Sequence, residues 1–235
     1  MARRTYIETF DEGAGGWTGC EGNGPEGVVA LQVQDGALVS RSPWWIDYNH
    51  APPGGGYLNL LFGLLTTREG YAPYAGKGGQ NRFVEDGYPL DWTNARITVR
   101  LKGEAELKGA KVHLLIQAKV GDKWVNCVLT GQPLAITPDW AEQTLTLTPD
   151  PEQWQCIGSH VSRMDRYTWG EAADVLRDLN GDIIFVLFPV EVVPVEPVQG
   201  NPHALRAGED YAVDPSRLPE GYVMMDTIQI EFAEG

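Results

Sequence analysis

The chain has 235 residues, 43% of them hydrophobic, and a net charge of −14 from 18 Lys and Arg against 32 Asp and Glu. This length and apolar content suffice for one large β-domain with a substantial core, so we expect a single domain over residues 1–235. The negative charge repels polyphosphate and anionic lipid surfaces, so we expect neither a nucleic-acid partner nor a membrane partner.

The first residues and the cysteines bear on the cellular compartment. "MARRTYIETF" starts basic but becomes polar by Glu8 and lacks the apolar run of a signal peptide. We therefore expect a cytoplasmic protein as the chain is given, or a secreted one if a leader has been removed. Cys20, Cys127 and Cys156 cannot all pair within one chain and show no C-x-x-C spacing, so reduced thiols are expected.

Short apolar or alternating runs, separated by Gly, Pro, Asn and Asp, recur along the chain and indicate an all-β sandwich. The predicted strands span 5–10, 28–34, 37–42, 57–66, 95–102, 111–119, 123–130, 142–148, 182–189 and 222–232. About ten strands would form two sheets of roughly five each, as in a jelly roll. Continuous apolar runs from Leu58 to Leu65 and from Ile183 to Phe188 predict central strands that are covered on both faces.

One helix and two long loops interrupt this pattern. "TWGEAADVLRDLNGD" places Ala172, Val175, Leu176 and Leu179 on one stripe and ends at "NG", which predicts a helix that caps one end of the sandwich. The connections 67–94 and 190–221 are too long for simple turns. Long ordered loops in a compact domain often carry function.

Four segments resemble carbohydrate-binding jelly rolls and the laminin-B-like (galactose-binding-like) domains. They are "FDEGAGGW" at residue 10, "APPGGGYLNLLFGL" at 51, "WGEAADVLRDLNGDIIFVLF" at 169 and "MMDTIQIEF" at 224. The resemblance implies that the first and last strands lie side by side and that an early acid and the closing Asp hold a structural calcium. By position these ligands would be Asp11 and Asp226, helped by Glu8 or Glu12. The alternative is that Asp11 ends a strand in an Asx-turn and Asp226 faces solvent.

The densest aromatic cluster is "SPWWIDYNHAPPGGGY" at residues 42–57. Aromatic rings stack on the apolar faces of sugars while carboxylates and amides bind the hydroxyls, so the cluster predicts a carbohydrate site. The candidate ligand-binding residues, with those that the following loop adds, are Trp44, Trp45, Asp47, Tyr48, His50, Tyr71, Tyr74 and Arg82. The alternative is that one Trp belongs to the core and the other is only half-buried.

Two segments carry candidate acid–base residues. On "KVHLLIQAK", His113 and Gln117 share one strand face and resemble part of the site of alginate-lyase jelly rolls, although "Q-x-H" and "Y-F-K-x-G-x-Y" are absent. A solvated sheet face is the plainer interpretation. In "CIGSHVSRMDRYTWG", His160 with Asp165 could act as a general base and Arg166 could hold an anionic substrate, or the loop could simply hold a structural ion pair.

Three functions remain open. The first is non-catalytic carbohydrate binding through Trp44, Trp45 and Tyr48. The second is an enzyme on the same scaffold, a lyase, isomerase or hydrolase of a sugar, with His160 or His113 in acid–base roles. The third is an oligomerising protein that uses "PVEVVPVEPV" (189–198). A deep pocket around a histidine of shifted pKa would favour the enzyme, and an open aromatic platform would favour the binding protein.

Overall fold

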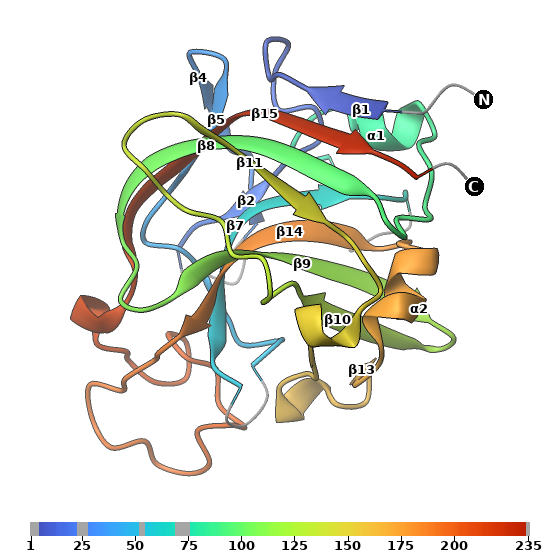
Figure 1. Cartoon of the computed structure of the whole chain (residues 1–235). Helices are drawn as coiled ribbons and strands as arrows, with labels where there is room; N and C mark the ends of the chain where they lie inside the picture. Colours follow the sequence, from blue (N-terminus) through green and yellow to red (C-terminus); the bar gives the residue numbers. More distant parts are fainter. Residues whose placement is uncertain (1–4, 23–27, 52–54, 69–75, 234–235) are drawn as a thin grey trace.

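We describe the fold from a computed structural model, which describes residues 5–22, 28–51, 55–68 and 76–233. Two antiparallel sheets pack face to face as a β-sandwich (Figure 1). The first sheet has six strands, in the order β11-β8-β15-β5-β4, with β1 also pairing with β15. Its strands are β1 (Thr5–Glu8), β4 (Gln32–Gln34), β5 (Ala37–Arg41), β8 (Arg96–Glu106), β11 (Ala141–Thr146) and β15 (Glu220–Glu231).

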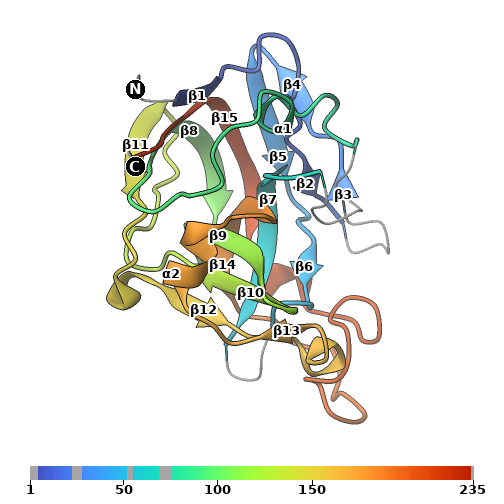
Figure 2. The same cartoon turned by 90° about the vertical axis from the view of Figure 1, so that its right-hand side faces the viewer.

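The second sheet has seven strands, in the order β12-β10-β9-β14-β7-β6, with β13 pairing parallel to β10. Its strands are β6 (Ile46–Asp47), β7 (Tyr57–Leu65), β9 (Lys111–Val120), β10 (Lys123–Val128), β12 (Gln155–Ile157), β13 (Tyr167–Thr168) and β14 (Asp182–Val190). A separate small ribbon joins β2 (Gly19–Cys20) to β3 (Val28–Val29). Figure 2 shows the two sheets side by side, with the long loop after β14 at the same end as β6 and β13.

The predicted all-β, two-sheet fold is confirmed, and each of the ten predicted strands overlaps a strand of the structure. The run at 28–34 divides into β3 and β4. The short strands β2, β6, β12 and β13 were not predicted, because two or three residues are too few to show a period of two.

Two further expectations about the strands are confirmed. β1 pairs with β15 with Glu8 opposite Ile228, so the first and last strands lie side by side. β7 and β14 are neighbours inside their sheet, and nearly every residue of both is buried. Continuous apolar strands therefore mark the positions covered on both faces.

The main core lies between the sheets. Strand alternation points Leu114, Ile116 and Ala118 of β9 towards the first sheet, where they join Ile97 and Ile228. The residues between them, His113, Leu115 and Gln117, point to the outer face of the second sheet but are 4%, 0% and 5% exposed. The prediction of a solvated face here is wrong, because loops cover this side and enclose a second apolar cluster.

The predicted helix is confirmed as α2 (Ala172–Arg177), whose Val175 and Leu176 are buried against the edge of the core beside β9 and β10. A second short helix, α1 (Arg82–Glu85), lies inside the loop 67–94 and was not predicted. It begins at Asn81, whose side chain accepts a hydrogen bond from Val84 N at 3.1 Å. Neither described helix is long and apolar enough to cross a membrane.

The cysteines differ from expectation. Cys127 of β10 and Cys156 of β12 face each other in the strand register and form a disulfide, while Cys20 is buried and takes no part in a disulfide. The prediction of three reduced thiols is therefore wrong for two of them. The pairing depends on the register of β10 with β12, which residue spacing in the sequence does not reveal.

Candidate functional site

The outer face of the seven-stranded sheet carries His113 and Gln117, two of the polar residues expected from the sequence. Its cover includes the segment around β6 and the segment after β12, which dock on each other through the Asn49 carbonyl. That oxygen accepts hydrogen bonds from His160 N at 2.9 Å and from Ser159 Oγ at 2.8 Å. Two distinct polar sites result, one at each end of β9.

At one end lies a buried chain of polar groups from β9, β10, β14 and the segment that includes β6 and His50. His50 Nδ1 makes a very short contact with Asp47 Oδ2, and its Nε2 lies 3.4 Å from the Gln117 amide. In the amide orientation that satisfies its neighbours, the Gln117 nitrogen donates to both carboxylate oxygens of Asp182 at 3.2 Å, and its oxygen lies 2.8 Å from Oδ1 of Asn126. We call these five residues the Asp182 cluster.

Burial controls the protonation of the Asp182 cluster. It raises the pKa of Asp182 to about 7, with Asp47 adding to this and His50 opposing it. For His50, burial lowers the pKa, but the charge and hydrogen bond of Asp47 outweigh burial, so the pKa is raised overall. The His50 ring is covered edge-on by Tyr167 at 5.2 Å, and Asp47, His50 and Asp182 are all buried. The cluster thus holds protons near neutral pH and is largely closed to solvent.

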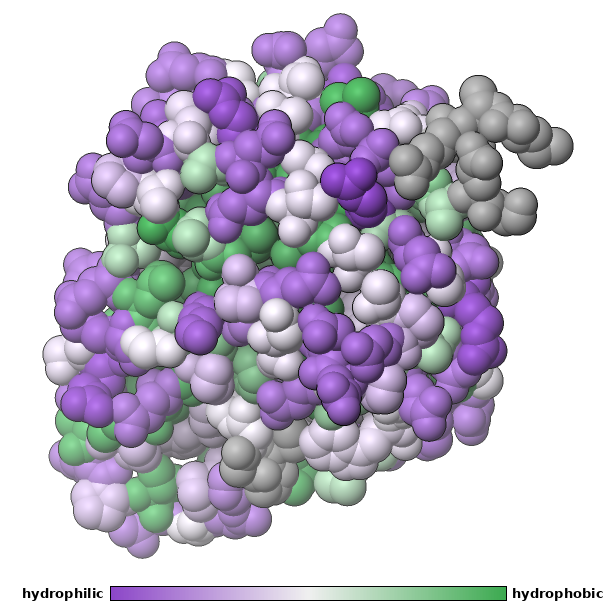
Figure 3. All heavy atoms as spheres, viewed as in Figure 1, coloured by the Kyte–Doolittle hydropathy of each residue, from purple (hydrophilic) through white to green (hydrophobic). Residues whose placement is uncertain are grey.

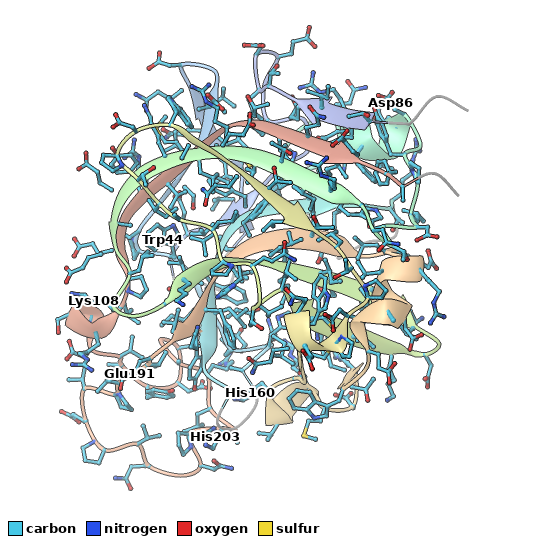
Figure 4. All side chains as sticks on the ribbon, in the orientation of Figure 1. Trp44, Asp86, Lys108, His160, Glu191 and His203 are labelled. Carbon is cyan, nitrogen blue, oxygen red and sulfur yellow. A yellow bond between two sulfur atoms is a disulfide. The ribbon has the colours of Figure 1, made fainter. Side chains whose placement is uncertain are left out.

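At the opposite end of β9 the structure has an open cleft of about 590 Å³, which we call the His113 cleft. Its apolar wall is Phe188, Pro189 and Val190, at the end of β14. Its polar side chains are Lys111, His113, Thr130, Gln155 and Glu191. Figure 4 shows Glu191 at this end of the molecule.

The protonation state of His113 follows from its contacts. Nδ1 lies 3.1 Å from the Leu129 carbonyl oxygen, which can only accept, so Nδ1 carries a hydrogen. Burial lowers the pKa of His113, and nearby Lys111 lowers it further, so the ring is neutral at neutral pH. Nε2 is therefore an acceptor and is the ring nitrogen left to meet a ligand hydroxyl.

Trp44 and Trp45 do not form the exposed aromatic platform that the sequence predicted. Trp44 is 2% exposed, and its Nε1 donates to Ser40 Oγ at 2.9 Å inside the main core (Figure 4). Trp45 is half-buried against the outer apolar cluster and meets Tyr48 edge-on at 5.6 Å. The pair thus has one core ring and one half-buried ring, which corrects the expectation that Trp44 faces a ligand.

The other predicted ligand residues are dispersed. Tyr48 is largely buried beneath the Arg206 guanidinium, 5.9 Å from its ring centre. Asp47 and His50 belong to the closed Asp182 cluster. Arg82 lies in α1 and forms ion pairs with Glu8 and Glu12. Tyr71 and Tyr74 lie outside the described residues.

The predicted catalytic residues do not form one group. His160 is buried beside Tyr48, with the two ring centres 6.4 Å apart, and burial lowers its pKa. Asp165 and Arg166 are exposed and pair with each other at 3.9 Å. His113 lies in the cleft at the other end of β9. Figure 4 shows His160 beside the loop that carries His203.

The carboxylates proposed for calcium do not fit a metal site. Arg82 binds both oxygens of Glu8, Thr9 Oγ1 donates to Asp11 at 2.7 Å, and Arg100 Nη1 lies 2.6 Å from one oxygen of Asp226. The other Asp226 oxygen has no hydrogen-bond partner among the residues that the structure describes. Across the described part of the chain, no three His, Cys, Asp or Glu residues are grouped so that they could hold a metal ion.

Sequence reasoning missed most of the cleft. Thr130, Gln155, Phe188 and Glu191 come from three separate stretches and form no motif. Only the strand alternation that places His113 on the outer face of β9 was visible in advance. The described lining of the cleft also has no tryptophan, which was the signal used to locate a sugar site.

Comparisons with known proteins add little to this picture. No protein-family profile matches the chain, and no curated protein matches it. A solved structure described as "Prominent members of the human gut microbiota express endo-acting O-glycanases to initiate mucin breakdown" resembles it with a TM-score of 0.41 and 11% sequence identity. The alignment covers 97% of this chain and 99% of that chain. A similarity this distant indicates neither the ligand nor the chemistry of the chain.

Proposed function

We propose that this chain binds a carbohydrate in the His113 cleft without changing it chemically. The observation that carries the proposal is a cleft with one apolar wall and one hydrogen-bonding wall. A sugar ring has an apolar C–H face and a rim of hydroxyls. Pro189, which is exposed next to the buried Phe188, suits the first, and His113, Thr130 and Gln155 suit the second. Ligand pockets commonly measure roughly 300–1,000 Å³, a range that includes this cleft.

The experiment incubates the protein with a panel of saccharides and records the melting temperature of the protein and the mass of each sugar together. We expect some saccharide to raise the melting temperature with its mass unchanged. His113→Gln should weaken that binding by roughly fivefold, the worth of one lost hydrogen bond of about 1 kcal/mol. His203→Gln changes an exposed histidine of the long loop and should bind like wild type. A panel with no stabilising saccharide, or a His113→Gln variant of full affinity, would refute the proposal.

An enzyme acting on a sugar in the same cleft is the second candidate. The neutral imidazole of His113 favours it, because an unprotonated Nε2 can accept a proton. Binding alone is the better-supported function, because the carboxylate of the cleft, Glu191, is engaged with Arg217 Nη2 at 2.6 Å. A changed sugar mass in the same panel, lost in His113→Gln, would establish the enzyme instead.

The oligomerisation hypothesis receives less support. In the segment 189–198, Val192 packs against the main core, while Val195 is 58% exposed. A single exposed apolar residue such as Val195 is common on protein surfaces. Figure 3 shows hydrophobic residues on this face lying between hydrophilic regions.

The disulfide supports one statement about location. A bond between Cys127 and Cys156 persists in oxidising compartments and is rare where glutathione keeps thiols reduced. We therefore propose that the protein works outside the reducing cytoplasm, where extracellular glycans are also found. Labelling of free thiols in protein isolated under alkylating conditions tests this. One reactive cysteine after denaturation supports it, and three contradict it.

A further inference from the structure

If the proposed function holds, the charge of the His113 cleft indicates the charge of the sugar that it binds. Lys111 is exposed at the start of β9 and lines the cleft. Among the described residues, its Nζ makes no ion pair and no hydrogen bond, while Glu191, the carboxylate of the same cleft, is paired with Arg217. One cation of the cleft is therefore uncompensated.

This local charge contrasts with the whole chain. Glu191 and Arg217 cancel, and His113 is neutral, so the cleft retains the single positive charge of Lys111 in a molecule of net charge −14. An ammonium group beside neutral hydrogen-bonding side chains attracts an anionic group. A neutral sugar would offer Lys111 no ionic partner.

We infer that the bound sugar carries one anionic group, a carboxylate or a sulfate ester, which contacts Lys111 while His113, Thr130 and Gln155 bind its hydroxyls. The acid fixes the orientation of the sugar ring in the cleft. Lys111 is then the residue that determines specificity, and His113 contributes to binding of neutral and acidic sugars alike.

The test compares sugars that differ in one group. Histidine-ring NMR signals of the full chain are followed during titration with glucose and glucuronate, galactose and galacturonate, and galactose 6-sulfate. Acetate and inorganic sulfate serve as anions without a ring. The variants are Lys111→Gln and Lys111→Arg, with Lys119→Gln as the matched control, because Lys119 is an exposed lysine on the same face of β9 at its opposite end.

We expect an acidic sugar to bind roughly five- to tenfold more tightly than its neutral partner, a preference that weakens as ionic strength rises. Lys111→Gln should abolish the preference, while Lys111→Arg and Lys119→Gln should keep it. Preference for the uronate or for the sulfate identifies which acid is recognised. Equal binding of neutral and acidic sugars, an unchanged preference in Lys111→Gln, or equal binding of acetate or sulfate alone would overturn the inference but leave sugar binding standing. Absence of binding by every sugar would overturn the proposed function as well.

Discussion

Asp182 and His50 are buried titratable groups whose protonation couples the stability of the fold to pH. The unfolded chain ionises an Asp near pH 3.8, whereas folded Asp182 keeps its proton up to about pH 7. Folding therefore becomes less favourable as the pH rises between these values. The pKa of His50 is raised above 6.5, so its stabilising contribution is complete below that pH and is lost as the pH rises through the folded pKa.

Replacing Asp182 with asparagine should flatten this dependence. An amide does not ionise, so in Asp182→Asn the loss of stability between about pH 4 and pH 7 should shrink by on the order of a few kcal/mol. Denaturant unfolding across this range measures the effect. Asp122→Asn, in the exposed turn between β9 and β10, is the control and should follow the wild-type curve. If the unfolding free energies of wild type and Asp182→Asn changed in parallel with pH, the raised pKa of Asp182 would be contradicted.

The ion pair of Glu8 with Arg82 gives a second test on single side chains. Glu8 is 2% exposed, whereas Glu12, which binds the same arginine, has an 83% exposed side chain. Arg82→Ala leaves a buried carboxylate without its cation and should cost about 3 kcal/mol of unfolding free energy. Glu12→Gln removes only an exposed partner and should cost less than about 0.5 kcal/mol. Equal losses in the two variants would contradict this difference in burial.

Some of these side chains could be placed from the sequence and others could not. Alternation along β9 correctly put His113 and Gln117 on one face. It could not show that loops from distant segments bury that face, or that Trp44 rather than Trp45 enters the core. Such outcomes depend on how segments far apart in the chain pack together, which a local pattern does not contain.

Among the elements, length and periodicity decided what could be predicted. The long strands β8, β9, β14 and β15 were all predicted, as was α2, because each shows a clear apolar pattern. The short strands β6, β12 and β13 have two or three residues, too few to show such a pattern, and each pairs with a longer strand. The four-residue helix α1 is likewise too short to show one. β12 is one of these short strands, and its pairing with β10 creates the disulfide.

The link between β10 and β12 should contribute measurably to stability. The disulfide joins residues with a sequence separation of 29. Because it restricts the unfolded chain, a loop of this length should add about 3–4 kcal/mol to the free energy of unfolding. Unfolding of wild type by denaturant, with and without a thiol reductant, should show this loss, and Cys127→Ala with Cys156→Ala should reproduce it. In that double variant the reductant should then have no further effect. A wild-type midpoint that is insensitive to the reductant would show that the bond does not form.

The molecule as a whole is a sandwich whose second sheet supports two different polar sites on one covered face. The Asp182 cluster closes one end of β9, and the His113 cleft opens at the other. Composition and strand count predicted the sandwich, and the pairing of β1 with β15 followed from the resemblance of the chain ends to jelly rolls. The cleft could not be predicted, since its walls come from β9, β14 and turns that are separate in sequence.

The measurement that tests the central claim most directly is a map of backbone amide shifts in NMR spectra as the stabilising saccharide is added. Binding in the His113 cleft predicts that the largest shifts fall at Gly109 to His113, Thr130, Gln155, Phe188, Val190 and Glu191. Shifts concentrated instead around half-buried Trp45, or around Trp169, which is 59% exposed, would contradict the cleft and restore an aromatic platform as the binding site.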